Sequence, residues 1–103
     1  MNSTKQIKTA AYNPADYLET PEDVKAYLEA CLEENDPALF IEAIGVVARS
    51  KGMAIISEQT GLGRESLYKA FGSGKHPRFE TVFKVVQALG LKFELGESDP
   101  IHA

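Results

Sequence analysis

The sequence is poor in the residues that bind metals or form cross-links. It has one cysteine, Cys31, and two histidines, His76 and His102. A single cysteine excludes a disulfide within the chain and any zinc site built from cysteines. The two histidines are far apart and have no carboxylates at ligand spacing, so we expect neither a metal nor another cofactor. Cys31 falls on an apolar stripe, which favours packing in the interior over a role as a reactive thiol.

Long apolar runs are also absent. The longest, FIEAIGVVA, is interrupted by Glu42 and is too short to cross a bilayer. The first residues, MNSTKQIKTAAYNP, include no apolar stretch of the kind found in signal peptides. The sequence therefore predicts a cytoplasmic protein that does not associate with membranes.

No pattern typical of an enzyme can be recognised. The chain has no Ser-His-Asp set and no pair of carboxylates that would share a pocket. Its GLG and GSG segments do not follow a predicted strand, as the glycines of a nucleotide-binding loop do. We therefore do not expect catalysis.

Charge is distributed unevenly along a chain of ordinary globular composition. Apolar residues make up 44% and charged residues 25%, a balance that argues against disorder. The net charge is −4, but from Arg64 to Lys92 six basic side chains outnumber two acidic ones, Glu65 and Glu80. Residues 16–36, by contrast, contain eight acidic side chains and one lysine. Because the local field governs binding, the second half can attract nucleic acid despite the negative total.

Capping signals and periodicity predict one all-α domain over residues 16–95, between a flexible N-terminal arm at 1–15 and a flexible tail at 96–103. Helices are expected at 21–35, 37–50, 53–60, 64–71 and 79–89. Thr20 and Asp36, each followed by proline, are typical helix starts, and Gly90 is a typical helix end. The face of the last helix predicted to be buried carries Phe79, Val82, Phe83, Val86 and Leu89.

Residues 53–71 have the spacing of a helix-turn-helix. Gly61 can supply the positive φ that a tight turn needs. Ser57, four residues earlier, is small enough for the place where the two helices touch. Four apolar residues of this motif are predicted to face the core, namely Ile56, Leu62, Leu67 and Ala70.

The polar side chains of the second motif helix and of the following loop, GSGKHPR, are predicted to face solvent. A helix lying in the major groove would present such residues to base edges and phosphates. The candidate DNA-binding residues are Arg64, Glu65, Ser66, Tyr68, Lys69, Lys75, His76 and Arg78. The alternative is a structural helical hairpin with a solvated polar face, since short helix–Gly–helix patterns are common. The basic loop favours DNA binding.

The span 52–90 resembles the phage-repressor-type (lambda-repressor-like, Xre) DNA-binding domain. More narrowly, residues 16–95 resemble addiction-module antidote proteins, the HigA-like antitoxins, most specifically in GRESLYKAFGSGKHPRFETVFKVVQALGLKFEL. The resemblance implies a compact five-helix bundle, repression of the protein's own operon and neutralisation of a small basic toxin of the RelE/ParE type. Two positions depart from the pattern. Met53 stands where such repressors often have glutamine, and Glu65 is unusual at a position expected to face the bases.

The segment LKFEL at 91–95 alternates apolar and charged residues, which predicts a short C-terminal strand. Leu91, Phe93 and Leu95 would form an apolar row on a strand that has no partner in the chain. Because a lone strand leaves its backbone groups unpaired, we expect the same segment of a second chain to pair with it across a two-fold axis. Such a homodimer would read a palindromic operator in double-stranded DNA. The alternative is an extended tail lying back on its own bundle.

Three functional interpretations stay open at this point. In the first, the acidic run at 16–36 binds the basic toxin. In the second, that run is only a solvated face of a stand-alone transcriptional regulator without a toxin. In the third, the chain is a protein-interaction module that has lost DNA binding. A short basic protein encoded by the neighbouring reading frame would favour the first.

Overall fold

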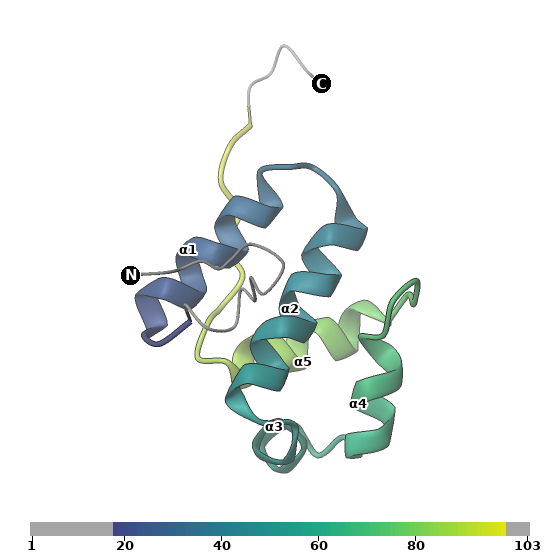
Figure 1. Cartoon of the computed structure of the whole chain (residues 1–103). Coiled ribbons are helices and arrows are strands. Elements are labelled where there is room, and N and C mark those ends of the chain that lie inside the picture. The colour runs from purple at the N-terminus through teal and green to yellow at the C-terminus, as the bar shows by residue number, and fades with distance from the viewer. Residues whose placement is uncertain (1–17, 99–103) are drawn as a thin grey trace, which may run out of the picture.

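The computed structural model describes residues 18–98, which form five α-helices and contain no strand (Figure 1). The helices are α1 (Pro21–Leu32), α2 (Pro37–Lys51), α3 (Met53–Thr60), α4 (Arg64–Ala70) and α5 (Phe79–Ala88). The predicted all-α class and the five helices are confirmed. The predicted arm at 1–15 and the end of the predicted tail lie outside the described residues.

The first two helices begin where their capping residues predict. The Thr20 hydroxyl accepts from the Asp23 amide at 3.0 Å, and the Asp23 carboxylate accepts from the Thr20 amide at 3.1 Å, which forms a reciprocal capping box. The Asp36 carboxylate accepts from the Ala38 amide at 3.0 Å. Helix α1 ends three residues earlier than expected, because the amides of Glu34 and Asn35 donate to carbonyls only three residues back and Asn35 takes a left-handed conformation with φ 58°.

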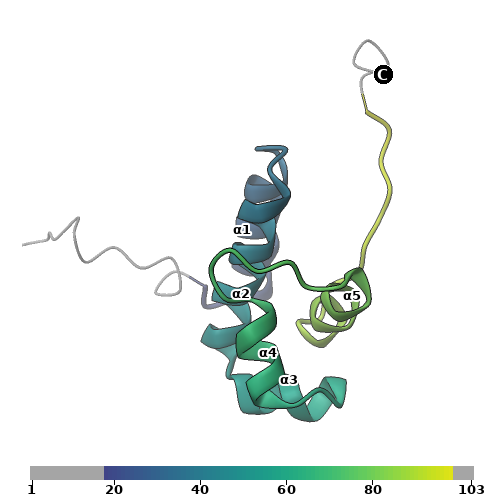
Figure 2. The same cartoon turned by 90° about the vertical axis from the view of Figure 1, so that its right-hand side faces the viewer.

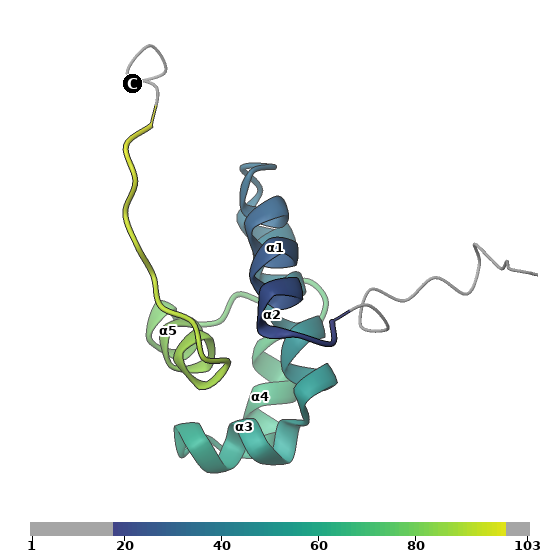
Figure 3. The same cartoon turned by 90° about the vertical axis from the view of Figure 1, so that its left-hand side faces the viewer.

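The helices surround one apolar core. Helix α1 packs on α2, α3 packs on α2 and α4, and α5 closes the bundle against α2 and α3. Figure 2 looks onto α4, whereas Figure 3, from the opposite direction, looks onto α1. The buried residues are Leu28, Ala43, Ile44, Val47, Ala48, Met53, Ile56, Leu67, Phe71, Val82, Val85 and Val86. Helix α2 thus contributes the most residues to the core, and each of the other four helices adds at least one.

The predicted buried face of α5 was wrong at two positions. Phe79 and Phe83 are 66% and 39% exposed, while Val85, which was not predicted to be buried, is completely covered. The buried face of α5 is formed by Val82, Val85 and Val86, and the two phenylalanines lie outside this face. They pack instead on Phe93, with ring centroids 5.6 and 5.7 Å from that ring. The three rings (Phe79, Phe83 and Phe93) form an aromatic cluster at the surface.

The predicted strand at 91–95 is not seen in the single chain. Helix α5 ends in a Schellman motif, in which the Gly90 amide donates to Gln87 and the Leu91 amide donates to the carbonyl of Val86. Beyond this point the described chain leaves the bundle without a strand partner (Figure 1). A strand requires a hydrogen-bonded neighbour, and residues 18–98 offer none. Leu91 packs partly on the core, and Leu95 is 101% exposed.

Candidate DNA-binding surface

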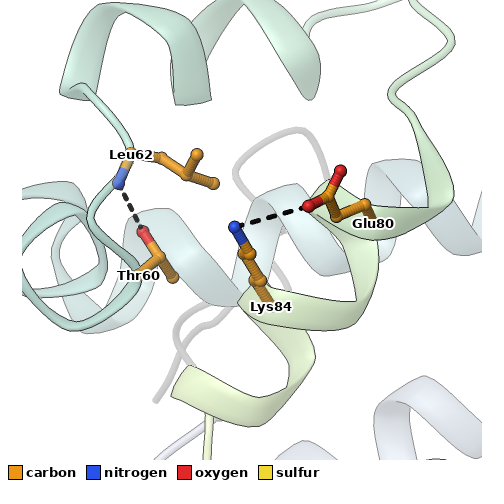
Figure 4. A network of polar contacts seen from close by, with 4 residues as sticks. All are labelled: Thr60, Leu62, Glu80 and Lys84. Atoms are coloured by element: carbon orange, nitrogen blue, oxygen red, sulfur yellow. Dashed lines mark hydrogen bonds and ion pairs between the residues drawn. The ribbon is translucent and has the colours of Figure 1, made fainter.

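The turn between α3 and α4 is held by hydrogen bonds from side chains of α3. Gly61 has φ 79° and ψ 5°, as predicted, and an added Cβ would meet no atom within 4 Å, so the glycine is required by the backbone conformation alone. The Ser57 hydroxyl donates to the carbonyl of Leu62. The Thr60 hydroxyl donates to Ile56 at 2.8 Å and accepts from the Leu62 amide at 3.1 Å (Figure 4). These bonds fix the direction in which α4 starts.

Sequence reasoning had assigned Ser57 only a steric role and had missed the hydrogen bonds of the turn. Both hydroxyl residues sit in the last turn of α3, where side-chain oxygens can bond to backbone groups of a following turn. The position of these two residues in the last turn of α3 was therefore the sequence signal from which the hydrogen bonds of the turn could have been predicted.

Helix α4 is anchored by two buried side chains and by a close approach to α2. Leu67 and Phe71 are 1% and 2% exposed. Gly45, in the middle of α2, is buried beneath Phe71, and a Cβ built on it would lie 3.1 Å from the Phe71 Cβ. Only glycine fits here without movement of the neighbouring residue. A glycine inside a helix weakens it, so its presence was a sequence signal that the prediction had overlooked.

The eight candidate DNA-binding residues are all exposed, and they come from α4 and the loop that follows it. Figures 1 and 2 place this helix and this loop on the same side of the molecule. The four basic members are Arg64, Lys69, Lys75 and Arg78, and within residues 18–98 none of them forms an ion pair. Their charges are therefore available to an external partner. Tyr68, 48% exposed, adds an aromatic ring to the same helix.

Two further residues near the motif do not contribute to this surface. Lys84 of α5 forms an ion pair with Glu80 at 3.6 Å (Figure 4). Met53, which stands in place of the expected glutamine, is 3% exposed and belongs to the core. At the start of α3, Met53 is therefore not accessible to a partner.

Helix α1, which faces the viewer in Figure 3, carries the opposite charge. Exposed acidic side chains on α1 and just after it are Glu22, Glu29, Glu33, Glu34 and Asp36. Cys31 is partly buried between them and the core. Burial is the larger cause that raises the pKa of its thiol, and the negative charge of Glu34 is the smaller one. The thiol is thus protonated at neutral pH, which agrees with a packing role.

Residues 18–98 contain no group of three side chains suited to holding a metal ion. Within the same range, every helix is too short or too polar to traverse a bilayer.

A sequence model for a family described as probable addiction module antidote protein matches residues 8–97. The chain belongs to this antidote family. It is also 37% identical over 95 residues to an uncharacterized protein of Haemophilus influenzae, and the match covers 92% of this chain and 96% of the relative. No solved structure matches the chain. Because an antidote acts against a toxin, membership of the antidote family implies a toxin partner.

Proposed function

We propose that this antidote protein is a HigA-like antitoxin that binds operator DNA through a helix-turn-helix of the lambda-repressor type. As a homodimer it represses its own operon, and it neutralises a small basic toxin of the RelE/ParE type. In this role, α4 enters the major groove and the loop at 72–78 lies along the phosphates. The single supporting observation is the exposed, unpaired basic surface on a helix that a glycine turn and two buried anchors hold in place.

The residues of this surface have different roles in the proposed complex. Arg64, at the start of α4, reads base edges, whereas Lys75, in the loop, neutralises a phosphate. Glu65 repels phosphates and is accommodated where it accepts from the amino group of a cytosine. The net charge of −4 does not oppose binding, because the acidic side chains of α1 lie on the opposite side of the bundle.

Alanine substitutions at Arg64 and Lys75 are expected to separate base reading from phosphate binding. Lys75→Ala should weaken binding to all sequences and lower the salt slope by about one, because it removes one phosphate contact. Arg64→Ala should cost about 1–3 kcal/mol and relax sequence preference. Titration of DNA from upstream of the gene, at several salt concentrations, measures both. Glu58→Ala, an exposed α3 substitution, is the control, and wild-type affinity in both test variants would refute the assignment of this surface.

The proposed homodimer uses the segment after α5. A strand that is absent from the single chain can form when a second copy supplies the hydrogen-bonding neighbour. Leu95 supports this proposal, since this leucine is fully exposed among residues 18–98 and is not covered by the bundle. Leu91 and Phe93, by contrast, already pack on the core and on the aromatic cluster. Leu95 is therefore the cleanest probe of dimer formation.

Leu95→Asp is expected to convert the dimer into a monomer while leaving the bundle intact. The substitution places a charge in a proposed apolar contact but removes none of the contacts within the chain. Sedimentation at micromolar concentration, with circular dichroism as the test of folding, measures the effect. Glu97→Gln, on the same segment, is the control. A wild-type monomer, or a Leu95→Asp protein that remains dimeric, would remove this segment from the interface.

A further inference from the structure

An apolar groove runs between the α1–α2 hairpin and the end of the described chain. The groove consists of two adjoining hollows, of about 460 and 350 Å³, which share Leu32, Phe40 and Phe93 in their walls. Figures 2 and 3 show the elements that border it, with α1 and α2 on one side and α5 with the segment after it on the other. None of the eight candidate DNA-binding residues lines either hollow.

The groove exposes large apolar side chains that the domain does not need for its core. Leu32 is 50% exposed and Phe79 is 66% exposed, and Phe93 connects them across the depression. Single exposed apolar residues are common, but several around one hollow mark a surface that binds another molecule. The walls supply open apolar hollows against which an apolar side chain of a partner could pack.

The rim of the groove has a negative net charge. Glu29 and Asp36 line it, and Glu33 and Glu34 lie between them on the chain. Two lysines also lie on the rim, but Lys92 is paired with Glu94 at 3.5 Å, which leaves Lys25 as the remaining positive charge of the wall. A partner that presents lysines and arginines around an apolar ridge complements this arrangement.

We propose that this groove is the surface on which the antidote protein binds its toxin, and that the toxin inserts an apolar ridge flanked by basic residues. The proposal rests on the toxin-neutralising function proposed above and adds the location and chemistry of the contact. The groove contains none of the candidate DNA-binding residues, but Pro77, from the loop that carries three of them, lines one end of it. Leu32 and Phe79 are the apolar anchors, and Glu29 steers the basic partner.

The test uses the protein encoded by the reading frame next to this gene as the probe. Its affinity for the full-length chain is measured by calorimetric titration. Leu32→Asp should raise Kd by about thirtyfold, since a buried apolar anchor at the centre of an interface contributes most of the affinity. Ile55→Asp, which changes a comparably exposed apolar side chain on α3, should leave Kd within about twofold because surface changes outside an interface have small effects. Circular dichroism confirms that both variants fold.

A second pair of variants tests the charge of the rim. Glu29→Lys should slow association at low ionic strength, and the difference from wild type should vanish at high salt, because screening removes steering between exposed charges. Glu58→Lys, which makes the same change of charge on α3, should have no such effect. Stopped-flow mixing with the same neighbouring protein measures the rates.

The possible outcomes separate the groove from the function on which it depends. If wild type binds the neighbouring protein and both groove variants bind it equally well, the groove is not the toxin-binding surface, although the proposal of a toxin partner is supported. If wild type does not bind that protein, the toxin-neutralising function fails and the groove proposal fails with it. If Leu32→Asp abolishes dimer formation but leaves binding of the neighbouring protein unchanged, the groove belongs to a second copy and the proposal is overturned.

Discussion

Replacing Ile56 by alanine is expected to destabilise the domain by about 2–5 kcal/mol, the usual cost of emptying a filled position in a core. Ile56 is completely buried at the centre of α3, whereas its neighbour Ile55 is 44% exposed. Ile55→Ala should therefore change stability by less than about 0.5 kcal/mol, as surface substitutions do. Since small domains have a total stability of about 5–15 kcal/mol, the first change removes a large part of it.

Urea unfolding followed by circular dichroism measures both free energies. The pair is matched, because the same atoms are removed from adjacent residues of one helix. The Ile56→Ala variant should also bind operator DNA more weakly, since α3 supports the turn that directs α4. Equal losses of stability in the two variants would show that α3 does not pack as described.

Local signals in the sequence predicted the helices, because those signals act within a few residues. Thr20 and Asp36 cap the helices that follow them, and Gly61 takes the left-handed conformation that its turn requires. Each of these depends on a backbone conformation and a hydrogen bond whose partners are close in sequence. The exposed face of α4 was predictable for a similar reason, since its buried residues recur at helical spacing.

Features that depend on contacts between distant segments were not predictable in the same way. The burial of Gly45 depends on Phe71, which is far away in sequence. The sequence predicted Phe79 and Phe83 to be core residues because they are apolar and lie at helical spacing. In the structure they pack on Phe93 at the surface. The segment at 91–95 has the alternation of a strand, but alternation cannot supply the neighbouring strand that makes one.

The arrangement of charge explains how one small domain can serve two partners. Exposed basic residues lie on α4 and the following loop, exposed acidic residues lie on α1, and these elements are on opposite sides of the molecule (Figures 2 and 3). In the function proposed here, the first surface attracts nucleic acid and the second attracts a basic protein, because exposed charges act over about 10 Å at moderate ionic strength. A small net charge of −4 is therefore compatible with two oppositely charged surfaces on one domain.

The contact between Gly45 and Phe71 is expected to dominate the placement of α4. Phe71→Ala should cost about 3–5 kcal/mol, because it removes a buried ring and leaves a cavity over α2. Gly45→Leu should cost about 1–3 kcal/mol by overpacking, since even a Cβ at that position would lie 3.1 Å from the Phe71 Cβ. The overpacking cost of Gly45→Leu is offset by about 1 kcal/mol, because leucine has a higher helix propensity than glycine.

Combining the two substitutions should recover part of what each one loses. The leucine side chain at position 45 would occupy the space that the ring at position 71 vacates, so the double variant should be more stable than additivity predicts by about 1–2 kcal/mol. Urea unfolding of all four proteins in the cycle measures this coupling. As a control, Gly45→Leu combined with Tyr68→Ala, which removes a half-exposed ring of the same helix, should be additive within about 0.5 kcal/mol. Additivity in the Phe71 cycle would mean that α4 is not held against α2 through this contact.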